Sequence, residues 1–306
     1  MRIVISGGTG FIGHALCVSL CHDGHQVSVL TRNKETAQRA CGPKITAIEW
    51  NGREAATLAS CLEGADGVIN LAGAPIADGR WTEARKRLLT DSRVLATRSL
   101  VDALSRCSSK PRMLINASGI GYYGASDDRV LDEGSQRGHG FLADLCLAWE
   151  KEALRAQEFG VRVVTLRTGM VLEKDGGALP KMLLPFRLFA GGPILPGTQW
   201  VSWIHREDHI GIIRWALTTP TVSGSVNAVA PEPVTMSQFC ETLGQSLHRP
   251  SWLPVPGFIL NIALGELATL MTTGQRIYPE RALSGGYVFH YKKLAPALQH
   301  ILAAED

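Results

Sequence analysis

The sequence predicts an α/β protein in which a doubly wound parallel sheet is followed by a smaller, mostly helical C-terminal domain. Two observations lead to this prediction. Short apolar runs alternate with helical patterns up to about residue 175, as expected for parallel strands joined by crossover helices. From about residue 178 the alternation weakens at breaks rich in proline and glycine, and a helix-rich tail follows Pro231. A chain of 306 residues is long enough for one large and one smaller domain.

The first strand and the turn after it form the most informative motif. The apolar run Ile3 to Ser6 leads into Gly7, Gly10 and Gly13, which have the spacing G-x-x-G-x-x-G. Glycine lets the backbone turn tightly and approach a pyrophosphate, and the helix predicted from Phe11 offers free N–H groups to that anion. The motif therefore predicts a Rossmann-type dinucleotide site.

The second strand, Gln26 to Leu30, ends in residues that select the cofactor. A site for NAD usually has an acidic residue here to bind the ribose 2′-hydroxyl, and this stretch has none. Arg32 instead supplies a planar cation suited to a phosphate, and Thr31 supplies a hydroxyl beside it. We expect NADP(H) rather than NAD(H). The alternative is that Arg32 belongs only to a solvated loop.

Five more strands are predicted, at 45–50, 67–71, 113–117, 161–167 and 224–228, the last returning to the main sheet. Ligands of such sheets bind at the carboxyl ends of the strands. The small residues after the fourth strand would let a cofactor lie against the backbone, and Ser118 and Tyr122 follow the fifth. The expected division is a cofactor domain of residues 1–175, to which 204–230 return, and a substrate domain of 176–203 and 231–306.

Composition argues against several other classes of protein. A net charge of +3 without a basic stripe argues against a nucleic-acid partner. Seven scattered cysteines without paired ligand spacing predict no metal site and reduced thiols in a cytoplasmic protein. The apolar segment 258–271 is shorter than a membrane span and contains Glu266, so we expect a packed amphipathic helix there and no membrane association. A homodimer remains open.

These motifs resemble those of the extended short-chain dehydrogenase/reductase superfamily. Within it, the chain resembles an atypical group of epimerase family proteins with an NAD(P)-dependent epimerase domain and a distinct C-terminal domain. The matching pieces span the chain and include Gly7 to Gly13, Asn70 to Gly73, Arg80-Trp81, Ser92-Arg93, Ser118 with Tyr122 to Gly124, Leu166 to Gly169, Met182 to Arg187, Trp203 to Asp208 and Gly274 to Arg276.

The resemblance implies a set of residues that bind NADP(H): Gly7, Thr9, Gly10, Phe11, Ile12, Gly13, Thr31, Arg32, Leu71 and Ala72, with Arg93 and Val171 as weaker assignments. Arg93 has an equally acceptable interpretation as a surface arginine of a helix. In the motif Trp203 to Asp208, we expect His205 to organise the cap and Asp208 to cap the following helix.

One departure from the superfamily concerns catalysis. Typical relatives carry Tyr-x-x-x-Lys on the helix after the serine strand, where the lysine helps the tyrosine to exchange a proton. Alignment of that helix on Glu150 puts Leu142 and Cys146 at these positions, and Ser118 lies one residue before the usual serine position. We expect Tyr122 to be the proton donor and Ser118 a second hydrogen-bond donor. Other candidate proton carriers are Tyr123, His139, Asp144 and Cys146.

Two classes of function stay open. The first is an NADP(H)-dependent, epimerase-like oxidoreductase that acts on a hydroxyl or carbonyl of a sugar derivative or a small carbonyl compound. Val201 stands where nucleotide-sugar relatives carry an arginine for the diphosphate, which counts against such substrates, although Lys181, Arg187 or Arg276 could supply charge from the cap. The second is a catalytically inactive NADPH-binding sensor. The missing Tyr/Lys pair favours the sensor, whereas Ser118 and the elaborate cap favour the enzyme, which we take as the leading hypothesis.

Overall fold

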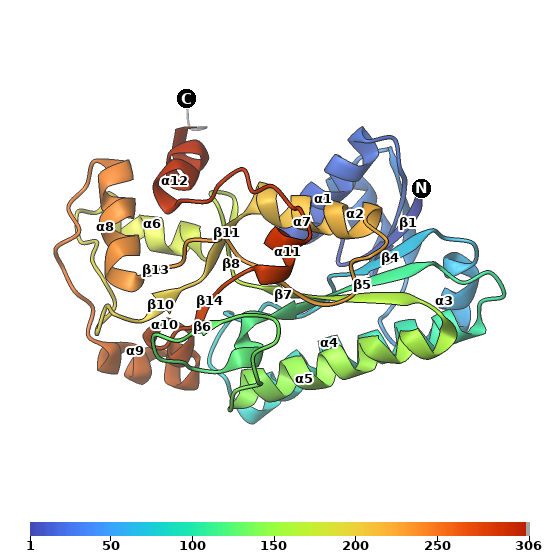
Figure 1. Cartoon of the computed structure of the whole chain (residues 1–306), viewed down its shortest axis with the longest axis horizontal. Helices are drawn as coiled ribbons and strands as arrows, with labels where there is room; N and C mark the ends of the chain where they lie inside the picture. Colours follow the sequence, from blue (N-terminus) through green and yellow to red (C-terminus); the bar gives the residue numbers. More distant parts are fainter. Residues whose placement is uncertain (304–306) are drawn as a thin grey trace.

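The computed structural model describes residues 1–303, and these residues contain a parallel sheet of seven strands (Figure 1). The strand order is β12-β7-β5-β4-β1-β2-β3, so the order reverses between β1 and β4. All seven predicted strands are present, and all neighbours are parallel. The strands are β1 (Arg2–Ser6), β2 (Gln26–Thr31), β3 (Ile45–Glu49), β4 (Gly67–Asn70), β5 (Met113–Gly119), β7 (Arg162–Thr168) and β12 (Gly224–Ala228).

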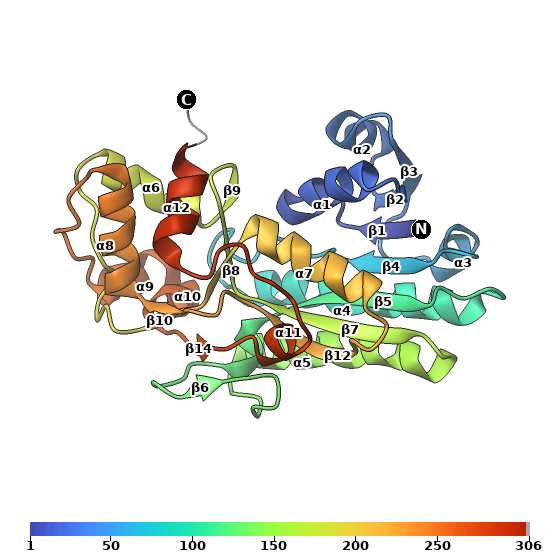
Figure 2. The ribbon, with the colours of Figure 1, turned by 45° about the horizontal axis from the view of Figure 1, so that its top comes forward.

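Helices cover both faces of this sheet (Figures 1 and 2). One face carries α1 (Phe11–His22), α2 (Lys34–Cys41) and α7 (Arg206–Thr218), and the other carries α3 (Ala55–Leu62), α4 (Glu83–Arg106) and α5 (Phe141–Leu154). Successive side chains of a strand point to opposite faces. Ile3 and Ile5 therefore enter the core under α1 and α7, and Val4 enters the core under α4.

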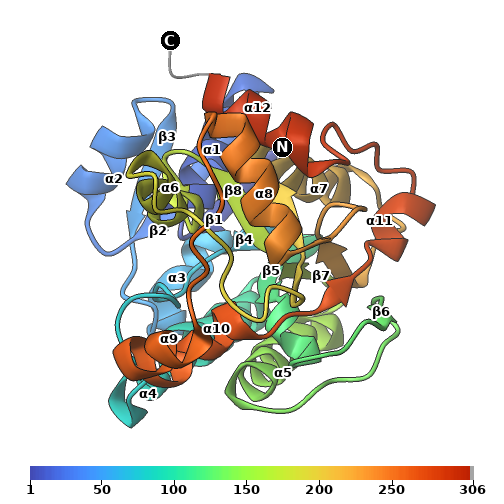
Figure 3. The ribbon, with the colours of Figure 1, turned by 90° about the vertical axis from the view of Figure 1, so that its left-hand side faces the viewer.

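A third core lies beyond the carboxyl ends of the strands, in the cap (Figure 3). After β7 the chain enters a small sheet of β8 (Met170–Glu173), β9 (Gly176–Gly177) and β11 (Trp203–His205). Helices α6 (Leu179–Arg187), α8 (Met236–Leu247) and α12 (Leu294–Ala303) pack around the fully buried Trp203 and Phe239. The apolar faces of these helices thus form a hydrophobic core separate from that of the main sheet.

The chain crosses between the two regions several times. Helix α7 and β12 lie on the main sheet, although cap segments precede and follow them. Near the C-terminus, β14 (Arg276–Ile277) pairs with β6 (Val130–Leu131), and α11 (Glu280–Ser284) packs on β12. A further short pair joins β10 (Trp200–Val201) to β13 (Val234–Thr235). Two 3₁₀ turns, η1 (Ile120–Tyr123) and η2 (Arg155–Phe159), flank α5 in the chain.

The packed amphipathic helix expected over residues 258–271 is wrong. Helix α9 (Gly257–Leu264) stops at Gly265, whose φ of +61° ends the helix, and the 3₁₀ turn η3 (Gly265–Ala268) leads into α10 (Thr269–Thr272). No residue of α9 is buried. The segment is apolar, but the positive φ of Gly265 divides it, so it does not form one continuous helix. None of the helices in residues 1–303 is long and apolar enough to cross a membrane.

Candidate functional site

The glycine turn between β1 and α1 is as tight as its sequence predicts. The backbone N–H of Gly10 donates to the carbonyl of Gly7 over 3.0 Å. A Cβ on Gly13 would lie 2.2 Å from that same carbonyl oxygen, and one on Gly7 would lie 2.7 Å from the carbonyl of Leu71. No side chain caps the first turn of α1, and no acidic residue lies in it. Its free N–H groups are therefore available to an anion.

The end of β2 lies two strands from β4 and offers a cation. Arg32 is exposed and makes no hydrogen bond or ion pair with any residue in the described part of the chain. The Thr31 hydroxyl bonds locally, donating to the carbonyl of Asn33 over 3.1 Å and accepting from its N–H over 3.2 Å. Asn33 in turn caps α2. The turn thus holds Arg32 in solvent at the position where a 2′-phosphate is expected.

Three further predicted cofactor residues surround the carboxyl end of β4. The backbone of Leu71 contacts Gly7, and Ala72 follows it. Arg93 lies under Gly73: its Nη2 donates to the carbonyl of Ala74 over 3.0 Å, and its guanidinium stands 5.3 Å from the Trp149 ring centroid.

Arg93 is therefore not a surface residue, and that alternative is wrong. Burial lowers the pKa of Arg93, and within residues 1–303 its hydrogen bonds go to backbone carbonyls and not to a carboxylate. A half-buried cation without a counter-ion favours an anionic ligand. Val171, the other weak assignment, is buried in β8 beside Ile204 of β11.

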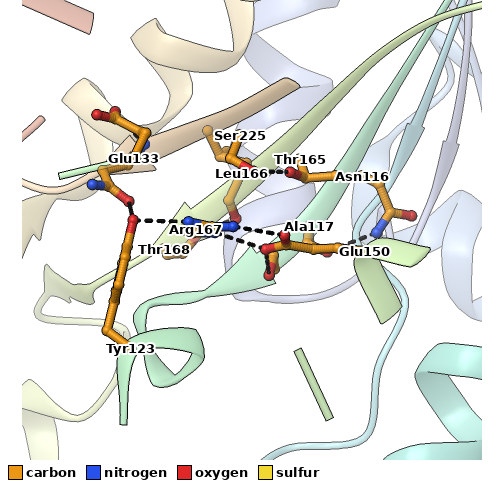
Figure 4. Close-up of polar contacts among 12 residues, drawn as sticks. Asn116, Ala117, Tyr123, Glu133, Glu150, Thr165, Leu166, Arg167, Thr168 and Ser225 are labelled. Atoms are coloured by element: carbon orange, nitrogen blue, oxygen red, sulfur yellow. Dashed lines mark hydrogen bonds and ion pairs between the residues drawn. The ribbon is translucent and has the colours of Figure 1, made fainter. Parts of the chain in front are cut away.

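A buried polar network links Glu150, Arg167 and Tyr123 (Figure 4) and includes Ser118, one of the two predicted catalytic residues. Ser118 Oγ donates to Glu150 Oε1 over 2.7 Å, and Arg167 donates to both oxygens of Glu150 from Nε and Nη2, each over 2.9 Å. Arg167 Nη1 also donates to the Tyr123 hydroxyl over 3.0 Å, and that hydroxyl donates to Asn227 Oδ1 over 2.7 Å. All five side chains are buried. Strands β5, β7 and β12 thus meet α5 and η1 through one set of hydrogen bonds.

The charges of this network are fixed by its geometry. Burial alone would lower the pKa of Arg167, but the hydrogen bonds and the charge of Glu150 outweigh it, and the pKa of Arg167 is raised. Burial raises the pKa of Tyr123 to about 12, against the opposing effect of Arg167. Arg167 is therefore charged and Tyr123 is a neutral phenol at physiological pH. The Tyr123 hydroxyl makes both of its hydrogen bonds inside the network, so Tyr123 has a structural role.

Tyr122 has a different environment from Tyr123. Its ring stacks on Arg167, with 3.4 Å between the guanidinium carbon and the ring centroid, and meets the Tyr123 ring edge-on at 5.3 Å. The ring is half-buried, and its hydroxyl bonds to none of the residues that the structure describes. The phenol is thus held by its ring and keeps its hydroxyl for another partner.

Ser118 is turned toward α5. Because side chains alternate along a strand, a serine one residue before the usual position faces the opposite side of the sheet. Its single proton is donated to Glu150, so Ser118 can accept a hydrogen bond from a ligand but cannot donate one while that contact stands.

The two positions at which the alignment of α5 expects a Tyr/Lys pair carry apolar or neutral groups. Leu142 packs against Gly121, where an added Cβ would approach it to 2.9 Å. Cys146 lies next to Gly119, and burial raises the pKa of its thiol to about 11. The thiol is therefore protonated at neutral pH and does not replace the lysine charge. Of the other candidates, His139 is exposed, and Asp144 is exposed and paired with Arg137.

The sequence reasoning missed Glu150 and Arg167 as site residues. The available signal was an arginine inside an otherwise apolar strand, since a charge within a buried strand needs a partner. The assignment of Asp208 as a helix cap was also wrong. His205 caps α7 through Nδ1, which accepts from the Glu207 N–H over 3.1 Å. Asp208 instead accepts from the Tyr287 hydroxyl and from backbone N–H groups of His290 and Tyr291 at 2.8–2.9 Å.

The prediction that His205 organises the cap is confirmed. Its ring stacks on Tyr291 at 4.0 Å, and its Nε2 lies 3.2 Å from Nδ1 of His300 on α12. Burial, and then the neighbouring His300, lower the pKa of His205 to about 4, so its ring is neutral at physiological pH.

A doubly wound sheet with a glycine turn at the reversal of strand order, and with a cap over its carboxyl ends, defines a Rossmann-type dinucleotide-binding protein of the extended short-chain dehydrogenase/reductase kind. The comparisons with known proteins agree. The chain belongs to the NAD dependent epimerase/dehydratase family, which matches residues 3–229, and residues 255–301 match a domain of unknown function, DUF1731.

Relatives match over almost the whole chain. The chain is 42% identical to the epimerase family protein SDR39U1 homolog, chloroplastic, of Arabidopsis thaliana, over 99% of this chain and 87% of that one. It is also 42% identical to the epimerase family protein YfhF of Bacillus subtilis, over 99% and 98%. The crystal structure of human epimerase family protein SDR39U1 with NADPH is 35% identical, covers 99% of both chains and has a TM-score of 0.90. The resemblance to the epimerase family proteins is thereby confirmed.

Proposed function

We propose that this protein is an NADP(H)-dependent, epimerase-like oxidoreductase in which Tyr122 exchanges the proton. The observation that carries the proposal is the Tyr122 phenol, which stacks on the charged Arg167 directly after β5 and keeps its hydroxyl unused by residues 1–303. The carboxyl end of β5 borders that of β4, where Leu71 meets the glycine turn. A proton donor and a dinucleotide site at adjoining strand ends are what hydride chemistry requires.

The cofactor assignment has three supports. The first turn of α1 is open to a pyrophosphate, and Arg93 presents a half-buried positive charge. Arg32 stands at the position where an acidic residue would repel a 2′-phosphate. The human relative that was crystallised with NADPH has the same fold over nearly the whole length. We therefore propose NADP(H), bound by the turn from Gly7 to Gly13 and by Arg32 and Arg93.

In this proposal each residue has a defined task. NADPH, when bound, supplies a hydride to a carbonyl carbon. The Tyr122 hydroxyl would donate its proton to the carbonyl oxygen and then regain a proton from solvent. In the reverse direction, Tyr122 would take the proton of the substrate hydroxyl when that hydroxyl is oxidised. Arg167 fixes the ring from one face, and Glu150 fixes Arg167. Ser118 is then a positioning residue that anchors Glu150, and not a donor to substrate.

The substrate class proposed is a sugar derivative or a small carbonyl compound without a diphosphate. Val201 is buried in the cap core, so its position supplies no charge to a ligand. Arg276 stacks on Trp200 at 4.5 Å. Stacking leaves the N–H donors of Arg276 unused by residues 1–303, so only the uncharged Val201 counts against a diphosphate.

A second candidate, an inactive NADPH-binding sensor, is favoured by Leu142 and by the neutral thiol of Cys146. One experiment separates the two. NADPH consumption and epimerised product are measured with the purified chain against a panel of sugars, nucleotide sugars and small carbonyls, with Tyr122→Phe as the variant. The enzyme proposal expects turnover that falls at least about a hundredfold in the variant while NADPH binding is retained.

If Tyr122→Phe keeps its turnover, the proton donor is another group and not Tyr122. Tight NADPH binding without product from any panel member would favour the sensor. A chain that binds no NADPH would contradict both candidates.

A further inference from the structure

A hairpin of the cap lies on the first turn of the dinucleotide helix. Strands β8 and β9 pair antiparallel, with Leu172 opposite Gly177 and Glu173 opposite Gly176. The ring of Phe11, the first residue of α1, packs against the two glycines: a Cβ on Gly176 would lie 2.3 Å from the ring, and one on Gly177 would lie 3.2 Å from it. Only glycine at these positions permits so close a contact.

Arg206 fastens the tip of this hairpin. Its Nη1 lies 2.6 Å from Asp175 Oδ1, and its Nη2 lies 3.1 Å from Glu173 Oε2. The same guanidinium stands 5.2 Å from the centroid of the Phe11 ring. The Arg206 side chain is only 19% exposed, and Glu173 only 13%, so the pair with Glu173 is shielded from solvent. Hydrogen bonds to charged groups are stronger than neutral ones.

The base of the hairpin is fixed to the cap. Leu172 of β8 pairs with His205 of β11 and enters the cap core. Arg206 is the first residue of α7, directly after His205, which caps that helix. The hairpin therefore connects the cap core at one end with the Phe11 ring at the other. Movement of the cap away from α1 must break the Arg206 pairs or pull Gly176 off the ring.

We propose that hairpin β8–β9 is a clasp that slows the release of NADP(H), with Arg206 as its latch. Phe11 couples the clasp to the cofactor, because its backbone N–H belongs to the turn that would hold the pyrophosphate. A closed clasp keeps this N–H in place, and an open clasp frees the first turn of α1. The inference rests on the cofactor part of the proposed function and is independent of the proton donor.

The test measures NADPH association and dissociation by stopped flow, with energy transfer from tryptophan to the cofactor, in the full chain. For Arg206→Ala we expect dissociation to become about tenfold faster, since two charge-assisted contacts of a largely shielded cation are lost. Association should change by less than about twofold. The matched control is Arg214→Ala on the same helix, because Arg214 pairs with Asp23 over 2.7 Å and does not contact the hairpin. Its rates should equal those of the wild type.

Three further variants guard against a misfolded Arg206→Ala protein. Asp175→Asn removes the negative charge of a side chain that is 58% exposed, and we expect dissociation about threefold faster. Gly176→Ala pushes the Phe11 ring away and should weaken NADPH binding, whereas the double variant Gly176→Ala/Phe11→Leu should recover part of it. Unchanged dissociation in Arg206→Ala and Asp175→Asn would overturn the clasp, as would an equal acceleration in Arg214→Ala. A wild-type chain without NADPH binding would overturn the cofactor proposal itself.

Discussion

Removal of one charge from the buried pair of Glu150 and Arg167 should destabilise the protein strongly. The change is Glu150→Gln, which keeps the shape of the side chain and an acceptor for Ser118. Arg167 is 3% exposed and Glu150 is 5% exposed, so water cannot replace the lost carboxylate. An uncompensated buried charge of this kind costs about 3–5 kcal/mol.

The cost converts into a measurable shift of the melting temperature. For a chain of 306 residues the entropy of unfolding is about 0.6 kcal/mol per degree, so 4 kcal/mol corresponds to roughly 6 °C. The matched double variant Glu150→Gln/Arg167→Met removes both charges and leaves no buried ion unpaired. We expect it to melt above the single variant, although it has lost one more native side chain.

Differential scanning calorimetry and urea unfolding of the wild type, of the single variants Glu150→Gln and Arg167→Met, and of the double variant check this reasoning. If the Glu150→Gln protein melts within about 1 °C of the wild type, the buried charge of Arg167 does not depend on Glu150 as its counter-ion. A double variant whose loss equals the sum of the two single losses would show that Glu150 and Arg167 do not act as a unit.

The other predictions concern the glycine turn, the cofactor and pH. Gly13→Ala should weaken NADPH binding about tenfold or more, because its Cβ would lie 2.2 Å from the Gly7 carbonyl, whereas Gly10→Ala, at 3.3 Å, should cost much less. Arg32→Ala should remove most of the preference for NADPH over NADH in titrations, and equal preferences before and after the change would contradict the Arg32 assignment. Burial lowers the pKa of His209, like that of His205, to about 4. Below the ordinary value of about 6.5 the unfolded chain binds protons that the folded chain does not, so stability falls between pH 6.5 and 4, by about 2 kcal/mol per histidine at pH 5. Urea unfolding at pH 7 and 5 tests this, and His209→Gln should lose less stability than the wild type.

The strands and the glycine turn could be predicted because their signals are local. A buried strand needs a short apolar run, and the turn needs glycine where any Cβ would meet the backbone, as at Gly7 and Gly13. The absence of an acidic residue beside Arg32 is equally local. The prediction of a packed helix over residues 258–271 was wrong because apolar composition does not show which surface covers a segment. Gly265 also divides this segment.

The seven-stranded α/β architecture and the dinucleotide motif could be predicted from the sequence alone. The partners of Ser118 and Tyr123 could be known only from the tertiary structure. Glu150 meets Ser118 across 32 positions of the chain, and Arg167 meets Tyr123 across 44. These contacts depend on the register of β5 against β7 and on how α5 packs over both strands. They are decided by the packing of whole elements, so neither a motif nor a spacing in the sequence reveals them.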